Sequence, residues 1–467
     1  MEDARKLLVE TKVKALGALS SANLVQLLDT STVEQALQVL AENHILSAPV
    51  VAPEDAGQAI GVRWPAQLPN SDIMGFVCVN DIITSFLEYY QSEVEGAAAA
   101  SAASDLSVAP SAGSSGGGAV SMLARMRRLE GLGLQFAQKQ LRDLTCKGCD
   151  GDFLHSRHAG EATLLELVMY GFLDPKRRGM HEGEQQAHVV HRVALFDRSG
   201  CVTCVISQTD ICRFLAAHME RLGGLGECSM AQLGWDRKQV VSCTPETPAL
   251  DAMRLMVAAG VSSLAVVSGA GVGGQEGGEG EDMQDATAAA AAPRGGRLLG
   301  NFSASEMRSM TAEHFGALSL PVGEFLALEH DTEYVLANRE RLLEAGVFGS
   351  PAHQFITDRS RRTTRPHSPG QEVGQRLIVA TAATTFAEVV DMIVRHRIHR
   401  VYVVDEREVP VGIVTCTDIL RKVVEVATEA VPASPAAAAA AAAAFAARSP
   451  RAAAAAAAAA DPATALA

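Results

Sequence analysis

Aromatic residues and positive charge are both scarce in this chain. Only 4% of its 467 residues are Phe, Trp or Tyr, and alanine tracts inflate the hydrophobic fraction of 48%. The formal net charge is −14, from 40 Lys and Arg against 54 Asp and Glu. An acidic chain repels nucleic-acid phosphates and anionic lipids, which argues against nucleic acid or membrane as a partner. Any anion that the protein binds must meet a local basic cluster.

The sequence also lacks the marks of a disulfide scaffold, a signal peptide and a membrane span. Its nine cysteines are few for this length and mostly lie in apolar runs, which favours a reducing compartment. The start, MEDARKLLVE, is charged throughout and has no apolar core. The tail 436–460 is nearly all alanine, which is too weakly hydrophobic for a good span, and Arg448, Pro450 and Arg451 interrupt it. We therefore expect a soluble protein of the cytoplasm or nucleus.

What the sequence does contain is a repeated pattern. The two clearest copies are HVVHRVALFDRSGCVTCVISQTDICRFL (188–215) and HRIHRVYVVDEREVPVGIVTCTDIL (396–420). Each has His-Arg before an apolar strand, then a second strand, a hydroxyl and an aspartate. His191 precedes Asp210 by 19 positions, and His399 precedes Asp418 by the same 19. Equal spacing in two distant segments indicates an internal repeat.

Two weaker copies follow the same pattern. One combines ILSAPVVAPE (45–54) with IMGFVCVNDIITSFL (73–87), and the other combines VSSLAVVSG (261–269) with RLLGNFSASEMRSM (297–310). The first ends on Asp81, whereas the second has Glu306 at that place. The insert of the second is rich in Gly and Ala, so we expect it to be disordered.

Helical patterns flank the strands of each copy. Thr385 and Glu388 form a predicted capping box, followed by an apolar stripe at helical spacing through Phe386, Val389, Val390, Ile393 and Val394. Ser31 and Glu34 predict a similar start in the first copy, and Pro248 to Gly260 bound a helix in the third. After the second strand we expect helices at 82–89, 211–218, 305–313 and 419–426. The unit is therefore strand, helix, strand, strand, helix.

A unit of about 50 to 60 residues buries little apolar surface alone, so we expect the four units to pair. The predicted boundaries are repeat 1 at 22–92 with an insert at 53–71, a disordered linker at 93–121, repeat 2 at 143–222, repeat 3 at 228–316 with a disordered insert at 270–296, a connecting segment at 317–371, repeat 4 at 372–428, and a low-complexity Ala-rich tail at 429–467. Within the connecting segment, 358–370 is a basic loop, either a solvated surface or a phosphorylation or docking segment.

These repeats resemble four cystathionine-β-synthase (CBS) domains in tandem. The segments that carry the resemblance are HRVALFD, CVISQTDICRFL, LLGNFSASEMR and HRIHRVYVVD with VGIVTCTDILR. The chain is similar over 22–428, apart from the inserts, to the gamma subunits of AMP-activated and sucrose-non-fermenting-type protein kinases, especially the plant gamma-like members. The resemblance implies an α/β (α+β) fold with the repeats paired into two Bateman modules in a pseudo-symmetric disc.

The resemblance also implies a ligand and its site. In that family, adenine nucleotides sit in clefts between paired repeats. The aspartate accepts hydrogen bonds from the ribose, the earlier Ser or Thr contacts phosphate, and the His-Arg pair reaches the phosphates. Carried over, the implied residues are His191, Arg192, Ser207 and Asp210 in repeat 2, and His399, Arg400, Thr415 and Asp418 in repeat 4. AMP, ADP or ATP would be a regulatory ligand, with no resident cofactor or metal.

The residue types agree with that chemistry. A carboxylate at a helix start can accept hydrogen bonds from two vicinal hydroxyls, and the planar fork of arginine suits phosphate. The following helix N-terminus adds partial positive charge, and histidine adds a donor. For each aspartate the plain alternative is a helix N-cap, and each histidine can be a surface residue.

The first and third repeats depart from the pattern. Leu46 replaces the histidine and Cys78 replaces the hydroxyl in repeat 1, although Asp81 remains. Repeat 3 has Ser303 with the longer Glu306. Asp81, Ser303 and Glu306 are therefore weaker nucleotide-binding candidates. We expect one or two working sites, with weaker discrimination between phosphates because Leu46 cannot hold one.

Other chemistry finds little support in the sequence. The pairs Cys146/Cys149 and Cys201/Cys204 are too far apart for a usual zinc ribbon, so we predict no metal site. GAGVGG (269–274) has no following lysine and is interpreted as a linker. The repeats, linkers and tail leave no room for a catalytic domain, so the chain is predicted not to be an enzyme.

Three functions remain open at this stage. The first is a regulatory gamma-like subunit that binds adenine nucleotides and joins a kinase catalytic alpha subunit and a beta subunit. The second is a stand-alone CBS sensor that regulates another enzyme or a redox partner. The third is a structural scaffold whose pockets are filled by side chains.

Overall fold

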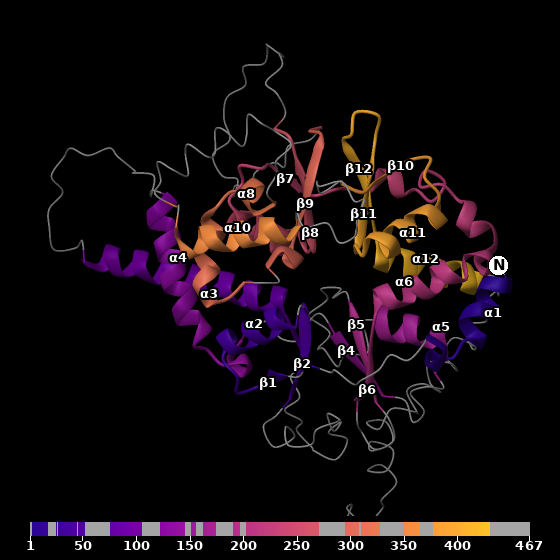
Figure 1. Cartoon of the computed structure of the whole chain (residues 1–467), viewed down its shortest axis with the longest axis horizontal. Coiled ribbons are helices and arrows are strands. Elements are labelled where there is room, and N and C mark those ends of the chain that lie inside the picture. Colours follow the sequence, from indigo (N-terminus) through magenta and orange to yellow (C-terminus); the bar gives the residue numbers. More distant parts are fainter. Residues whose placement is uncertain are drawn as a thin grey trace, which may run out of the picture.

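A computed structural model describes most of the repeated region (Figure 1). The described residues are 2–16, 25, 27–43, 45–51, 75–104, 122–144, 151–155, 162–173, 190–196, 202–269, 295–307, 310–326, 347, 349–363 and 377–429. The predicted insert at 53–71 lies outside them, as do most of the 270–296 insert and of the 93–121 linker. The tail beyond Glu429 is also outside the described residues.

Four three-stranded sheets form in the described part of the chain. In each, the first strand is parallel to the second, and the second is antiparallel to the third. The strands are β1 (Leu27–Leu28), β2 (Ser47–Val51) and β3 (Gly75–Cys78); β4 (Gly151–His155), β5 (Arg192–Phe196) and β6 (Val202–Ser207); β7 (Ser242–Cys243), β8 (Ser263–Val267) and β9 (Leu298–Ser303); and β10 (Val379–Thr381), β11 (Arg400–Val404) and β12 (Pro410–Thr415). One sheet lies in each repeat, so we number the repeats 1 to 4 by their sheets.

Helical segments connect and follow these strands. Repeat 1 has α2 (Val33–Glu42) and α3 (Val79–Ser104), and α4 (Met122–Ala137) and η5 (Leu141–Asp143) follow it. Repeat 2 has α5 (Leu164–Glu166), the π-helix η7 (Leu167–Leu173) and α6 (Gln208–Ala217), followed by η9 (Met219–Glu227) and η10 (Trp235–Arg237). Repeat 3 has α7 (Ala249–Ala259), η11 (Ala304–Met307), η12 (Ala312–Ser319) and α8 (Val322–Leu326), and α10 (Pro351–Thr363) follows. Repeat 4 has α11 (Phe386–His396) and α12 (Cys416–Glu429), while α1 (Glu2–Glu10) and η1 (Val13–Leu16) begin the chain.

The predicted order of strand, helix, strand, strand and helix is confirmed, and so are two of the predicted helix ends. The Thr385 amide donates to Glu388 Oε2 at 2.8 Å, and the Glu388 amide donates to Thr385 Oγ1 at 3.3 Å. The Thr385 amide, together with the Thr385 hydroxyl that donates to the same oxygen at 3.0 Å, lowers the pKa of the Glu388 carboxyl. Gly260 ends α7 with a φ of 62°, which glycine adopts without strain. Along α11, Phe386, Val389, Val390 and Ile393 are buried as predicted, and Val394 is half-buried.

Other local predictions were wrong. The capping box of α2 uses Thr32 and Gln35, one residue after the predicted Ser31 and Glu34. Helix α3 continues to Ser104, inside the predicted linker, because alanine favours helix strongly. Part of the predicted loop 358–370 is helical, since α10 reaches Thr363.

Repeat 3 does not form the predicted helix at 305–313. Two 3₁₀ segments, η11 and η12, take its place. In repeat 2 the Ser207 hydroxyl accepts from the backbone amide three residues on, which starts α6. The Ser303 hydroxyl instead bonds the Ser305 hydroxyl at 2.6 Å, so this side chain is engaged away from the backbone.

The two large hydrophobic cores join repeats that are not consecutive in sequence. One core combines repeats 1 and 3 and includes Phe86, Phe136 and Phe315, whose rings lie 4.3 to 6.1 Å apart by centroid. The other combines α1 with repeats 2 and 4. In Figure 1 repeats 1 and 3 occupy the left half and repeats 2 and 4 the right half. Helices therefore form the contact between repeats 1 and 3 and the contact between repeats 2 and 4.

Sheets provide the contacts between consecutive repeats. The Tyr402 hydroxyl of repeat 4 donates to Asn301 Oδ1 of repeat 3 at 3.0 Å. A small apolar cluster, Ala265, Val267, Leu298, Tyr402 and Val404, lies around this bond. Arg192 of repeat 2 similarly donates to Ser47 of repeat 1. Each repeat thus contacts one neighbour through helices and another through its sheet.

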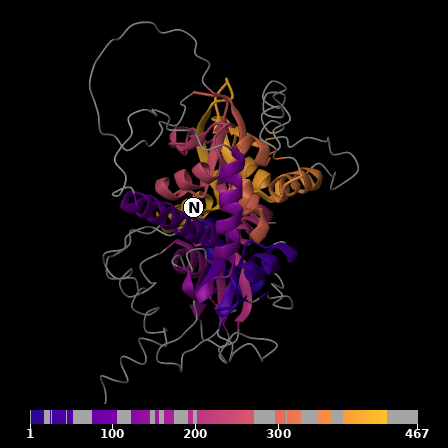
Figure 2. The same ribbon diagram turned by 90° about the vertical axis from the view of Figure 1, so that its left-hand side faces the viewer.

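Helix α4 lies outside the four repeats and braces repeats 1 and 3. It packs against α2 of repeat 1 and against η12 of repeat 3, along the face turned to the viewer in Figure 2. Gly133 lies at the contact with η12, where an added Cβ would come 2.5 Å from the Cβ of Phe315. Gly131, on the exposed side of the same helix, has open space around its Cα.

This contact predicts opposite effects for two glycine substitutions in α4. Gly133→Ala should lower the free energy of unfolding by about 1–3 kcal/mol, because the methyl group overpacks the Phe315 contact. Gly131→Ala should raise it by up to about 1 kcal/mol through helix propensity. Urea denaturation of both variants measures the difference. A Gly133→Ala protein as stable as Gly131→Ala would contradict the packing described here.

Candidate functional site

The His-Arg pair of each strong repeat lies beside its own hydroxyl-Asp pair. Arg192 pairs with Ser207 across β5 and β6, and Arg400 pairs with Thr415 across β11 and β12. The His191 carbonyl accepts the Gln208 amide at the start of α6. The structure therefore brings the backbone positions of the four candidates of each repeat close together, as the equal spacing of the two segments predicts.

The weaker repeats use the same register. Ser47 pairs with Cys78, and Ser263 pairs with Ser303. Ser47 and Ser263 are thus the structural counterparts of Arg192 and Arg400. Repeats 1 and 3 have no arginine at this strand position.

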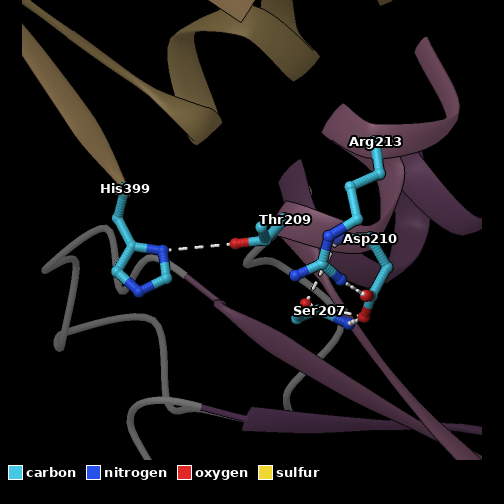
Figure 3. Close-up of polar contacts among 5 residues, drawn as sticks. All are labelled: Ser207, Thr209, Asp210, Arg213 and His399. Atoms are coloured by element: carbon cyan, nitrogen blue, oxygen red, sulfur yellow. Dashed lines mark hydrogen bonds and ion pairs between the residues drawn. The ribbon is translucent and has the colours of Figure 1, made fainter. Parts of the chain in front are cut away.

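Asp210 is held at the start of α6 by a set of local bonds (Figure 3). Its Oδ2 accepts from the Ser207 amide at 2.9 Å and from the Ser207 hydroxyl at 2.7 Å. Its Oδ1 accepts from Arg213 Nη1 at 2.6 Å. The Asp210 amide donates back to Ser207 Oγ at 3.3 Å, which completes a capping box.

Asp418 has the same geometry at the start of α12. Its Oδ2 accepts from the Thr415 amide at 2.8 Å and from the Thr415 hydroxyl at 2.6 Å. Its Oδ1 accepts from Lys238 Nζ at 2.5 Å. Lys238 follows η10, in the segment that leads into repeat 3, so Asp418 faces the boundary between repeats 3 and 4.

In both aspartates, therefore, the two carboxylate oxygens have different roles. Oδ2 is used by the cap, whereas Oδ1 pairs with a long cationic side chain whose exposed fraction is 51% for Arg213 and 42% for Lys238. Exposed ion pairs of this kind contribute little stability. A ligand hydroxyl can replace either cation at Oδ1 without breaking the cap.

The two arginines differ in their partners. Arg192 Nη1 donates to the Ser47 hydroxyl at 2.6 Å. Arg400 Nη1 is buried and has no hydrogen-bond partner among the described residues. Burial lowers the pKa of the Arg400 guanidinium, whereas the nearby Tyr402 and Cys416 raise it. A buried cationic donor without a partner is costly, so this position favours an anion beside it.

His399 reaches from repeat 4 into repeat 2. Its side chain is exposed, and Nδ1 lies 3.2 Å from the Thr209 hydroxyl, next to Asp210 (Figure 3). In the same interface the Thr417 hydroxyl donates to Gln208 Oε1 at 3.0 Å. Sequence reasoning missed Thr209, Gln208 and Thr417. The shared Thr-Asp pairs of QTD and CTD were the available signal.

The weaker candidates are less accessible. Asp81 is only 1% exposed and accepts from the Cys78 amide at 2.9 Å, with the Cys78 sulfur as the reciprocal acceptor. Ser303 is 3% exposed and bonds Ser305. Glu306 accepts weakly from the Ser305 hydroxyl at 3.4 Å. Burial of Asp81 and Ser303 removes them from ready contact with a ligand in this conformation.

A metal site and a membrane-spanning helix were assessed over the described residues. They contain no group of three or more His, Cys, Asp or Glu arranged to hold a metal ion. Cys146, Cys149 and Cys201 of the two Cys-x-x-Cys pairs lie outside these residues. Among the described helices, none combines the length and the apolar character needed to cross a membrane.

The difference between the two arginines predicts opposite stability changes in nucleotide-free protein. Arg400→Met should raise the free energy of unfolding by about 1–2 kcal/mol, because it removes a buried donor that lacks a partner. Arg192→Met should lower it by about 1 kcal/mol, because the bond to Ser47 is lost. Chemical denaturation after exhaustive dialysis tests both. Equal losses in the two variants would contradict the unpaired state of Arg400 Nη1.

Comparison with known proteins gives the same family as the residues. The profile of the CBS domain family matches residues 234–273 and 373–425. A protein named SNF1-related protein kinase regulatory subunit gamma-like PV42b, from Arabidopsis thaliana, is 25% identical over 224 residues. This alignment covers 48% of the chain and 51% of that relative, so it spans about half the length of the curated protein.

The solved structures to which the chain is similar are more distant in sequence. Protein MJ1225 from Methanocaldococcus jannaschii, described as an archaeal homologue of gamma-AMPK, is 15% identical with a TM-score of 0.45. The match covers 88% of the chain and 99% of that protein. CBSX2 in complex with AMP, a CBS-pair protein from Arabidopsis thaliana, is 13% identical with a TM-score of 0.22, over 42% of the chain and 97% of CBSX2. Two segments of the chain therefore match the CBS domain family, and about half of the chain is similar to a gamma-like regulatory subunit of a plant protein kinase.

Proposed function

We propose that the chain is a non-catalytic, gamma-like regulatory subunit of a SNF1-related or AMP-activated Ser/Thr kinase complex, and that it senses energy state by binding AMP, ADP or ATP. The observation that carries the binding proposal is the buried, unpaired Nη1 of Arg400 beside Thr415 and Asp418. The kinase role is supported by the similarity to the plant gamma-like protein.

In the proposed site of repeat 4, the nucleotide lies at the boundary with repeat 3. The ribose hydroxyls donate to Asp418 Oδ1 in place of Lys238. The displaced ammonium then lies close to the phosphates, together with Arg400 and His399. An arginine donor that is already desolvated loses little more hydration when phosphate arrives, so its pairing favours binding.

The proposed site of repeat 2 uses equivalent groups. Asp210 Oδ1 takes the ribose, and Arg213, its present partner, turns toward the phosphates. Arg192 first has to release Ser47, so ligand binding at this site breaks one hydrogen bond that has no equivalent in repeat 4. We therefore expect the repeat 4 site to bind more tightly than the repeat 2 site.

The sheet contacts support a module assignment. Repeats 1 and 2 are joined by the Arg192–Ser47 bond, and repeats 3 and 4 by the Tyr402–Asn301 bond. We infer that these sheet-paired repeats are the two Bateman modules, and that the helical cores join one module to the other in a pseudo-symmetric disc.

Calorimetry with two ligands tests the ribose contact. Asp418→Asn keeps an oxygen for the Thr415 cap but loses the charge, so AMP should bind about tenfold or more weakly, as charge-assisted bonds contribute about 1.5–3 kcal/mol. A ligand without the 2′-hydroxyl should bind the original protein more weakly than AMP does. In Asp418→Asn, loss of the 2′-hydroxyl should weaken binding little further.

Asp391→Asn is the matched control, since Asp391 is an exposed residue of α11 that forms an i,i+4 ion pair with Arg395. It should bind like the original chain, and Asp210→Asn should affect the weaker site alone. Equal AMP affinity in the original protein and in a double Asp210→Asn, Asp418→Asn variant would overturn the site assignment.

The kinase proposal has a separate test. The tagged full chain, captured from extracts of its own cells, should bring down a Ser/Thr kinase catalytic alpha subunit and a beta subunit, identified by mass spectrometry. Nucleotide binding without those subunits would instead favour a stand-alone CBS sensor.

A scaffold without ligand is the second candidate, because the carboxylates of Asp210 and Asp418 already have partners. Each accepts two hydrogen bonds from the Ser or Thr that caps its helix and one more from a cationic side chain. Binding to the native state must raise the melting temperature. If millimolar AMP, ADP and ATP all leave it unchanged, the scaffold is favoured.

A further inference from the structure

Two cysteines meet where repeat 2 packs on repeat 4. Cys212 belongs to α6 and Cys416 is the first residue of α12. Both side chains belong to the same hydrophobic core, and their residues are 0% and 4% exposed. Neither has a role in the proposed nucleotide sites.

Hydrogen bonds hold the start of α6 against the start of α12, where the two cysteines lie. Gln208 and Cys212 are four residues apart, so they lie on one face of α6. Gln208 Oε1 accepts from Thr417, the residue after Cys416. On the other side, Thr209 contacts His399, whose carbonyl accepts from the Cys416 amide at 3.2 Å and from the Cys416 thiol at 3.6 Å. Cys212 lies one turn along α6 from this contact, and its thiol interacts with that of Cys416.

The two thiols interact with one another, and their surroundings shift their pKa values in opposite directions. Hydrogen bonds from the Cys212 thiol and His399, with the nearby His191, lower the pKa of Cys416. The Cys416 sulfur and burial raise the pKa of Cys212 well above its usual range. A thiolate beside a neutral thiol is the arrangement that dithiol oxidation requires.

We propose that Cys212 and Cys416 are a redox-active pair, which a hydroperoxide oxidises to a disulfide that covalently joins repeat 2 to repeat 4. The Cys416 thiolate attacks a peroxide oxygen, the O–O bond breaks, and a sulfenic acid forms as hydroxide leaves and takes up a proton. The Cys212 sulfur then attacks Cys416 Sγ, the S–O bond breaks, and the Cys212 proton leaves with that oxygen as water. With hydrogen peroxide, two thiols give one disulfide and two waters.

The bond would join the two helix starts that carry Asp210 and Asp418. These helices are held together now by side-chain bonds that a ligand or a local opening can break. A disulfide replaces them with a covalent tie between residues 204 positions apart in sequence. The proposal does not depend on nucleotide binding, because the thiols and their contacts belong to the interface itself.

Other described cysteines provide an internal contrast. Cys243 in repeat 3 is as buried as Cys416, but burial and Glu246 raise the pKa of its thiol to about 12. Cys228 is half-buried, and its thiol donates to the Gly224 carbonyl at 3.3 Å. Neither faces a second cysteine in the contacts that the structure describes.

Peptide mapping of the full chain tests the proposal. Reduced protein is treated with a few equivalents of hydrogen peroxide, remaining thiols are blocked with iodoacetamide, and non-reduced peptides are read by mass spectrometry. We expect a Cys212–Cys416 peptide and a loss of those two thiols, both reversed by dithiothreitol, while Cys243 stays alkylatable after unfolding. Oxidation should also raise the melting temperature, and reduction should return it.

Two variants separate the roles of the thiols. Cys212→Ser should leave Cys416 as a sulfenic acid that dimedone traps, whereas Cys416→Ser should slow oxidation of Cys212 at least tenfold. Cys243→Ser, in the other core, should form the disulfide at the original rate. If either variant fails to fold, mapping of the original protein still decides. Peroxide that oxidises other cysteines and yields no Cys212–Cys416 peptide overturns the proposal.

Discussion

The arrangement of this protein depends on burying the apolar helix faces of one repeat against those of a non-consecutive repeat. No repeat encloses its own core: Phe86 of repeat 1 packs on Phe315 of repeat 3, and α6 of repeat 2 packs on α11 and α12 of repeat 4. This requirement follows from the small size of each unit. It forces the starts of α6 and α12 together, and with them the candidate residues of two repeats.

That packing has two consequences for the site. It creates a polar seam, in which His399 contacts Thr209 and the Thr417 hydroxyl donates to Gln208 across the boundary between repeats 2 and 4. It also leaves the strand arginines facing the sheet-paired neighbours, where Ser47 satisfies Arg192 and Arg400 Nη1 stays unpaired. The two strong repeats are therefore alike in sequence pattern but unequal in electrostatic state. The same seam also brings a thiol from each repeat into contact.

Local structure was largely predictable because its causes are local. The Thr385 cap, the apolar stripe of α11 and the αL glycine at the end of α7 depend on residues within a few positions. Failures came where local preferences were close in energy. Thr32 and Ser31 are both good caps, and the Ser303 hydroxyl had two possible partners. The helical extension of α3 to Ser104 reflects alanine propensity that a linker composition concealed.

The sequence by itself determined the four repeats, the order of their strands and helices, and the pairing of each His-Arg with a hydroxyl and an aspartate, because equal spacing and strand register specify them. Only the tertiary structure decided which repeats share a core, which arginine lacks a partner, and that Lys238, Thr209 and the Cys212–Cys416 pair belong to the same region. Those relations join residues up to about 200 positions apart in sequence. They arise from burial and charge at interfaces, which no local pattern contains.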